Sequence, residues 1–304
     1  MLFRWDQSFL TVHTPAKLNL FLEVLNKRPD GFHNLETVMV MLGIYDTLRF
    51  SLIPKSDSNS NEPTIQLRVC TSNLPGMTSI PTGSDNLVVQ AAELLRSHAG
   101  YEGGAQIQLW KRIPAQAGLA GGSSDAAATL VGLNRLWKLN LPQTELHQLA
   151  AQLGSDVPFF LTKTPAAVCR GRGEMIEPLQ LPLGLFFVVV KPKSGLSTPA
   201  VFRQWKPQMP RQSAMPLIDE LHRGPSPRLA KTLFNALQTP AEALNSEIAT
   251  LRDVFSKEPV SGHMMSGSGT AYFGLCRHRR HAEFVAARLS SRRIGRVAVA
   301  RSQF

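Results

Sequence analysis

The sequence predicts an α+β fold, on the pattern of its segments and on its composition. The N-terminal part is rich in β-forming residues broken by turn signals, and amphipathic helical patterns become frequent after residue 85. The chain has 304 residues, 43% hydrophobic and 18% charged, which suits one large two-layered domain or two domains of ordinary size. A substantial core can therefore form, and global disorder is not expected.

Each element is predicted from local periodicity and from its flanking residues. The expected strands cover 9–13, 17–25, 45–53, 65–70, 105–114 and 185–191, with "RPDGFH" (28–33) as a turn. The expected helices cover 85–100, a segment from Ser123 or Ser124 onward, 143–153, 228–238, 241–256 and 279–291.

Two polar segments and a change of composition divide the chain further. Residues 54–64 are predicted to form a surface loop or hairpin insertion. Residues 203–230 carry no assignable motif and are expected to shape a substrate entrance or to form a plain surface loop. Pro and Arg become more frequent after about residue 166, so a domain boundary is expected around 160–185.

The sequence argues against a membrane or secreted protein. The longest apolar run, "LGLFFVVV" (183–190), is far shorter than the ~18 residues of a membrane span. The N-terminus lacks the pattern of a secretory signal. Cys70, Cys169 and Cys276 are odd in number and far apart, which argues against disulfides and zinc and favours the cytoplasm.

The net charge of +11 suggests an anionic partner. Eight arginines and a single acidic residue lie between Arg277 and Phe304. Such an excess attracts nucleic acid or a small substrate with several phosphates. A plain basic surface that sets solubility explains it equally well.

The stretch "AGLAGGSSDAAATL" (117–130) has the composition of a phosphate loop but no Walker lysine and no dinucleotide spacing. Its glycines, Gly118, Gly121 and Gly122, allow a close approach of the backbone to a ligand. Ser123 and Ser124 occupy N-cap positions before an Ala-rich helix, whose free amides attract anions, and Asp125 is expected to stabilise that helix N-terminus. The alternative is a glycine-rich connection with an ordinary cap.

Two further motifs are weak alone. "MSGSGTAYFGL" (265–275) is a second Gly/Ser loop that enters a strand-like run. In "TPAKLNLFL" (14–22), Lys17 and Asn19 are two residues apart on a predicted strand and therefore share a face.

Together and in this order, the three motifs resemble the GHMP kinase superfamily. "RPDGFHNLETVM" and "LGSDVPFFL" are closest to its members in the non-mevalonate isoprenoid pathway, which phosphorylate a cytidine-diphosphate-linked methylerythritol. The resemblance implies a GHMP kinase fold: an N-terminal domain (1–165) similar to the ribosomal-protein S5 domain 2-like fold, and a C-terminal α/β sandwich domain (166–304). It also implies ATP and Mg²⁺ as cofactors, and a monomer or homodimer.

The resemblance also implies roles for particular residues. Asp156 in "GSDVP" is the implied catalytic base and Lys17 its partner, whereas an isolated Asp before Pro158 is more often a cap or turn residue. Ser124 is the implied Mg²⁺ ligand, and Gly267, Ser268 and Gly269 form the third glycine motif. The ATP phosphates would be held by Pro114, Ala115, Gln116, Ala117, Gly118, Leu119, Ala120, Gly121, Gly122, Ser123 and Ser124.

The substrate would be bound by six residues. Asn19 would hold the reacting hydroxyl or orient Lys17, and the cytidine end would contact Phe32, His33, Thr198, Pro199 and Phe202. For the two phenylalanines, core packing is the structural alternative. The sequence departs from the family pattern at Phe32, where Tyr is usual, and at Ala120, where Gly is common.

Two other functions compete with this interpretation. Homoserine and mevalonate kinases belong to the same superfamily, but "DGFHNLET" argues against them. An RNA-binding protein is compatible with the charge, but no aromatic residues are interleaved with the arginines and no RNA motif is recognised.

Overall fold

The computed structural model describes residues 1–6, 8–53, 64–71, 80–162, 164–180, 184–223 and 227–303. The chain forms two compact units. The first comprises Met1–Ala16, Ile44–Ile113 and Ala120–Thr162, and the second comprises Lys17–Gly43, Pro114–Leu119 and Lys163–Phe304. Residues 17–43 and 114–119 therefore pack with the C-terminal half of the chain, whereas the predicted domains meet at one cut near residue 165.

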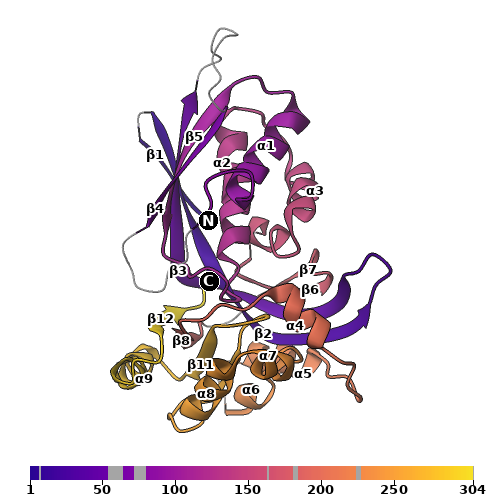
Figure 1. Ribbon diagram of the computed structural model, residues 1–304, viewed down its shortest axis with the longest axis vertical. Coiled ribbons are helices and arrows are strands. Elements are labelled where there is room, and N and C mark those ends of the chain that lie inside the picture. Colours follow the sequence, from indigo (N-terminus) through magenta and orange to yellow (C-terminus); the bar gives the residue numbers. More distant parts are fainter. Residues whose placement is uncertain are drawn as a thin grey trace. The chain divides into compact units, whose positions relative to one another are not determined.

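The first unit is a sheet with three helices on one face (Figure 1). Its strand order is β1–β2–β3–β5–β4. The bounds are β1 (Leu2–Asp6), β2 (Phe9–Lys27), β3 (His33–Ile53), β5 (Gly104–Lys111) and β4 (Ile65–Thr71). β4 and β5 are parallel, and the chain between them contains α1 (Leu87–Ala99), since parallel strands need a crossover.

The helices of this unit cover the apolar face of the sheet. They are α1, α2 (Gly121–Leu136) and α3 (Gln143–Leu153), followed by the short 3₁₀ helix η1 (Pro158–Leu161). Alternate residues of the strands are buried beneath them, among them Leu48 and Phe50. A Cβ at Gly132 of α2 would lie 2.7 Å from Phe50 Cε2, so the missing side chain lets this helix approach the sheet closely.

The second unit contains the far halves of β2 and β3 and a separate four-stranded sheet. β6 (Ala166–Gly171) pairs with β3, β7 (Met175–Leu179) pairs with β6, and β9 (Phe234–Asn235) pairs with β2. The separate sheet is antiparallel, in the order β10 (Gly262–Met265), β11 (Tyr272–Cys276), β8 (Phe186–Lys191) and β12 (Arg296–Arg301).

Helices complete the core of the second unit. They are α4 (Thr198–Gln204), α5 (Met215–Arg223), α6 (Pro227–Lys231), α7 (Gln238–Leu244), α8 (Ser246–Phe255) and α9 (Arg279–Ser291). One buried cluster joins Val188 and Tyr272 of the separate sheet to Phe255 and Val285 of the helices. Leu22 and Val24 of β2 belong to the same cluster, so residues 17–43 are part of this core.

Several predicted elements are confirmed and others are wrong. The helices at 143–153 and 279–291 agree with α3 and α9, and α1 ends at Gly100 as expected. The strands expected at 9–13 and 17–25 form one strand, β2. The helix expected at 228–238 is wrong, because α6 ends at Lys231 and β9 follows.

The helix expected at 241–256 is interrupted. Asn245 is extended and its side chain accepts a hydrogen bond from Glu247 N, which ends α7 and begins α8. The predicted insertion at 54–64 lies, except for Thr64, outside the described residues. Across the described part of the chain, none of the helices has the length and apolar character needed to cross a bilayer. All three cysteines are free thiols.

Candidate active site

In the second unit, the loop 114–119 is fixed by its main chain. Gly118 has φ 72°, and a Cβ there would lie 2.1 Å from the Ser266 carbonyl oxygen, so only glycine fits. Ser266 Oγ donates a hydrogen bond to Gly118 O (3.0 Å), and Ala271 N donates to Ala117 O (2.9 Å). The loop 114–119 and the third glycine motif are therefore packed together.

Lys17 and Asn19 lie side by side on β2, as predicted, and both are buried. Lys17 Nζ donates to Asn19 Oδ1 at 2.5 Å. Asn19 Nδ2 in turn donates to Thr37 Oγ1 (2.8 Å), whose hydroxyl donates to Phe21 O (2.6 Å). Asn19 thus orients Lys17, and Thr37 holds Asn19, a role for Thr37 that no sequence motif indicated.

The third glycine motif lies against this pair. Gly267 has φ 57°, and a Cβ on it would be 3.2 Å from Asn19 Oδ1 and 3.3 Å from Lys17 Nζ. Asn235 Nδ2 donates to both Met265 O and Gly267 O at 2.8 Å, which fixes the entry to the motif. Ser268 Oγ lies 2.7 Å from Thr198 Oγ1, so a predicted substrate residue contacts this motif as well.

In the first unit, α2 begins earlier than expected and without a side-chain cap. Its first residue is Gly121, and the N-cap is Ala120 in the left-handed conformation (φ 53°, ψ 34°). The departure at position 120 therefore matters, because an L-residue in this conformation costs about 1–2 kcal/mol. Ser123 belongs to the first helical turn, whose amides remain available to an anion, whereas the Ser124 amide donates to Ala120 O (2.9 Å).

Ser124 is turned toward β2. Its Oγ donates to Pro15 O (2.6 Å) and lies 2.5 Å from Thr14 Oγ1, and the residue is fully buried. This arrangement conflicts with Ser124 as a Mg²⁺ ligand, whereas the side chain of Ser123 is half-buried. Among the residues that the structure describes, no group of His, Cys, Asp or Glu could hold a metal ion.

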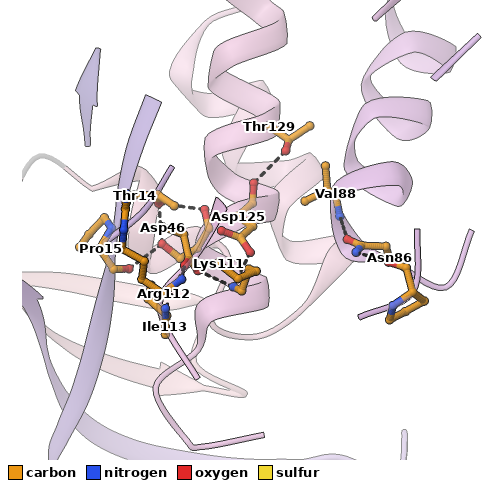
Figure 2. Close-up of polar contacts among 12 residues, drawn as sticks. Thr14, Pro15, Asp46, Asn86, Val88, Lys111, Arg112, Ile113, Asp125 and Thr129 are labelled. Atoms are coloured by element: carbon orange, nitrogen blue, oxygen red, sulfur yellow. Dashed lines mark hydrogen bonds and ion pairs between the residues drawn. The ribbon is translucent and has the colours of Figure 1, made fainter. Parts of the chain in front are cut away.

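Asp125 is not the surface residue of a helix end. It is buried, and its Oδ2 accepts a hydrogen bond from Lys111 Nζ at 2.7 Å, while the same ammonium contacts Asp46 (Figure 2). The expectation that Asp125 acts through the helix N-terminus is corrected by this ion pair. Lys111 and Asp46 were missed, because 65 residues separate them in the sequence.

Asp156 lies in the first unit, in the turn between α3 and η1, and is half-buried. Val157, not Asp156, is the N-cap of η1 and makes no side-chain cap. The alternative considered for Asp156, a turn residue before Pro158, agrees with this position. Its pairing with Lys17, which belongs to the second unit, remains a proposal.

Two of the predicted cytidine residues, His33 and Phe202, form part of an aromatic cluster in the second unit, and Phe202 also packs against the core, as its structural alternative expected. The His33 and Phe202 rings are stacked 5.0 Å apart, and Trp205, which was missed, meets His33 edge-on at 5.6 Å. Burial lowers the pKa of His33, and the Lys27 charge lowers it further, so the ring is neutral near pH 7.

Phe32 lies next to His33 but is 49% exposed. The guanidinium of Arg172 lies 4.7 Å from its ring centroid, a second contact that the sequence did not indicate. Core packing, the alternative considered for Phe32, is thus not observed. Pro199 lies in the first turn of α4, directly after Thr198.

Comparison with known proteins identifies the family of the chain. The family description "GHMP kinases N terminal domain" matches residues 86–164, and "GHMP kinases C terminal" matches residues 217–294. With its two glycine motifs and the Lys17–Asn19 pair, the chain is a kinase of the GHMP class.

Curated relatives narrow the class. The 4-diphosphocytidyl-2-C-methyl-D-erythritol kinase of Pelotomaculum thermopropionicum is 41% identical over 92% of this chain and 93% of its own length. That of Gloeobacter violaceus is 36% identical over 90% of this chain and 88% of its own length. The chain therefore belongs to the 4-diphosphocytidyl-2-C-methyl-D-erythritol kinase family.

Comparison with solved structures supports the same family. A crystal structure of 4-(cytidine 5'-diphospho)-2C-methyl-D-erythritol kinase matches with a TM-score of 0.79 and 34% identity, covering 97% of this chain and 100% of that one. A homoserine kinase from Cytophaga hutchinsonii matches with a TM-score of 0.74 but 15% identity, covering 100% of this chain and 97% of that one. The second likeness shows the fold alone.

Proposed function

We propose that this protein transfers the γ-phosphoryl group of ATP to a hydroxyl of 4-diphosphocytidyl-2-C-methyl-D-erythritol. The product is the 2-phosphate, an intermediate of the non-mevalonate route to isoprenoid precursors. The observation that carries the proposal is the buried Lys17–Asn19 pair, packed against the Gly267 turn in a chain 41% identical to such a kinase.

Lys17 and Asp156 are the proposed catalytic residues. The Asp156 carboxylate accepts the proton of the attacking hydroxyl, a contribution typically worth about 10²–10⁴ in rate. The Lys17 ammonium, oriented by Asn19, stabilises charge on the transferring phosphoryl group.

The proposed ATP cradle is the segment 114–124. Backbone amides and the N-terminus of α2 supply the positive potential that a Walker lysine supplies elsewhere. A Mg²⁺ ion bound to the phosphates would neutralise part of their charge, and the half-buried Ser123 hydroxyl is the better placed serine to meet it.

His33 and its aromatic neighbours are the proposed cytosine site. A neutral imidazole can hydrogen-bond the edge of the base, and Phe32 and Phe202 offer faces for stacking, worth about 1–3 kcal/mol per base. Thr198 and Pro199 line the same pocket in this proposal.

The test is an ATP-dependent phosphorylation assay with the cytidyl substrate, homoserine and mevalonate, with NMR identification of the product. We expect turnover of the cytidyl substrate only. Turnover of homoserine or mevalonate alone would overturn the proposal. Asp156→Ala should abolish turnover and leave nucleotide binding intact, and a fully active variant would remove Asp156 as the base.

A further inference from the structure

Three ionisable side chains of the first unit are buried beneath the start of α2 (Figure 2). Asp46 comes from β3, Lys111 from the end of β5 and Asp125 from the first turns of α2. Their side chains are 0%, 5% and 3% exposed. The Lys111 ammonium donates to both carboxyl groups, with 2.7 Å between Nζ and Asp125 Oδ2.

The cluster also holds the main chain that leads into the phosphate loop. Asp46 Oδ1 accepts hydrogen bonds from the amides of Arg112 and Ile113 (2.9 Å for the second). Ile113 directly precedes Pro114, the first residue of the proposed cradle. One network therefore connects the entry of the loop to the helix that follows it.

The Lys111 ammonium lies close to Gly121, the first residue of α2. A Cβ placed on Gly121 would be 3.1 Å from Lys111 Nζ and 2.9 Å from Ile113 Cγ2. Any shift of Lys111 or Ile113 would therefore be transmitted to the helical turn that is proposed to receive the phosphates.

Burial of these ionisable groups costs free energy, because buried ions lose their hydration. A protein in which apolar residues of similar volume replace such a cluster is often as stable or more stable. Asp125 Oδ1 is buried and finds no hydrogen-bond partner among the described residues. Burial, together with the nearby Asp46, raises the pKa of Asp125 well above its ordinary value, although Lys111 opposes this. Stability alone does not explain such a cluster.

We propose that Asp46, Lys111 and Asp125 form a positioning device for ATP: the ammonium, clamped between two carboxyl groups, fixes the first turn of α2 where it meets the phosphates. This inference rests on the proposed function in one respect, that the turn receives ATP. The three are positioning residues, since they act through the backbone of residues 112–121.

The two carboxyl groups have different tasks. Asp46 accepts with both oxygens, from Lys111 and from two loop amides, and the amide nitrogen of an Asn could not accept in place of either oxygen. Asp125 accepts from Lys111 with one oxygen, and the amide oxygen of an Asn can take the place of that acceptor. The cluster therefore tolerates Asn at position 125 but not at position 46.

The experiment compares Lys111→Met, Asp46→Asn and Asp125→Asn with the wild type. It measures the Kd for ATP by calorimetry, the KM for ATP and for the cytidyl substrate, and the melting temperature. Lys111→Met and Asp46→Asn should weaken ATP binding about tenfold or more and leave the KM of the cytidyl substrate within about twofold. Asp125→Asn should weaken ATP binding less than Asp46→Asn does, because it keeps an oxygen acceptor for Lys111.

Three outcomes would contradict the proposed positioning role. They are wild-type ATP affinity in a folded Lys111→Met, an equal rise of the KM for ATP and the KM for the cytidyl substrate, and a loss of ATP affinity in Asp125→Asn as large as in Lys111→Met. If Lys111→Met does not fold, the comparison of Asp46→Asn with Asp125→Asn decides alone. Failure of the wild type to phosphorylate the cytidyl substrate would overturn the proposed function, whereas the ATP Kd comparison tests the cluster independently.

Discussion

At the scale of single residues, the site depends on positions where a side chain is excluded or its partners are fixed. Gly118 excludes a side chain because Ser266 O is too close, and Asn19 is fixed between Lys17 and Thr37. Motif spacing identified Gly118, Lys17 and Asn19. Thr37, Lys111 and Arg172 were not identified, because their contacts join segments that are distant in the sequence or lie outside any motif.

Gly118→Ala should raise the KM for ATP by about tenfold or more. The added Cβ would lie 2.1 Å from Ser266 O, so the loop must move, and a misplacement of about 1 Å can cost about 10²-fold in rate. Steady-state kinetics at varied ATP measure the effect. Gly83→Ala is the control, since nothing lies within 4 Å of its Cβ position, and equal kinetics in the two variants would contradict the expectation.

The substrate affinity should depend on pH through His33. Its pKa is lowered by burial and by Lys27, so the neutral ring predominates at all pH values above its ordinary pKa of about 6.5. The KM for the cytidyl substrate should be constant above about pH 7 and should rise only as the pH falls through the lowered pKa. His33→Gln should remove that rise. A rise that persists in this variant would assign it to another group.

At the scale of elements, tertiary contacts overrode several local signals. Two strands were expected at 9–13 and 17–25, yet β2 continues from one to the other through Pro15. Asp125 has the position of a helix-end residue, but Lys111 binds it. The apolar spacing at 228–238 suggested a helix, but Asn235 is a strand residue whose amide holds the third glycine motif. Elements with strong periodicity and clear end signals, such as α1, were predicted correctly.

Gly132→Ala tests the packing of α2 on the sheet. Alanine favours a helix over glycine by about 1 kcal/mol. Here, however, its Cβ would lie 2.7 Å from Phe50 Cε2, and overpacking costs about 1–3 kcal/mol. We expect a lower free energy of unfolding in urea, restored in part by Phe50→Leu in the double variant. A more stable Gly132→Ala would show that the helix has room to move.

At the scale of the whole molecule, the chain passes between the two units after residues 16, 43, 113, 119 and 162. Lys17 and the loop 114–119 lie directly at these crossings. Composition predicted one boundary, around 160–185, because a change of composition is local in the sequence. It does not reveal that strand residues early in the chain pack into a core formed mostly by later residues. The class of fold and the three motifs were predictable, since they are local in the sequence.

A fragment of residues 166–304 should not fold on its own. It lacks β2 and β3, and with them Leu22 and Val24 of the core cluster. Each buried aliphatic side chain contributes about 1.5–3 kcal/mol, against a total domain stability of about 5–15 kcal/mol. Thermal melting followed by circular dichroism should show no cooperative transition, with the full chain as control. A cooperative melt would mean that the later elements suffice for a core.

The phosphate loop has left-handed backbone at every second residue: Gln116, Gly118 and Ala120, with φ of 50°, 72° and 53°. Turns of this kind direct consecutive amides toward one concave side. A loop that binds through backbone amides uses no side-chain functional group, so a substitution cannot remove its binding groups. Its affinity for a ligand can therefore change through the shape of the backbone alone, and Ala120 shows that a residue with a Cβ can occupy one of the left-handed positions of this loop.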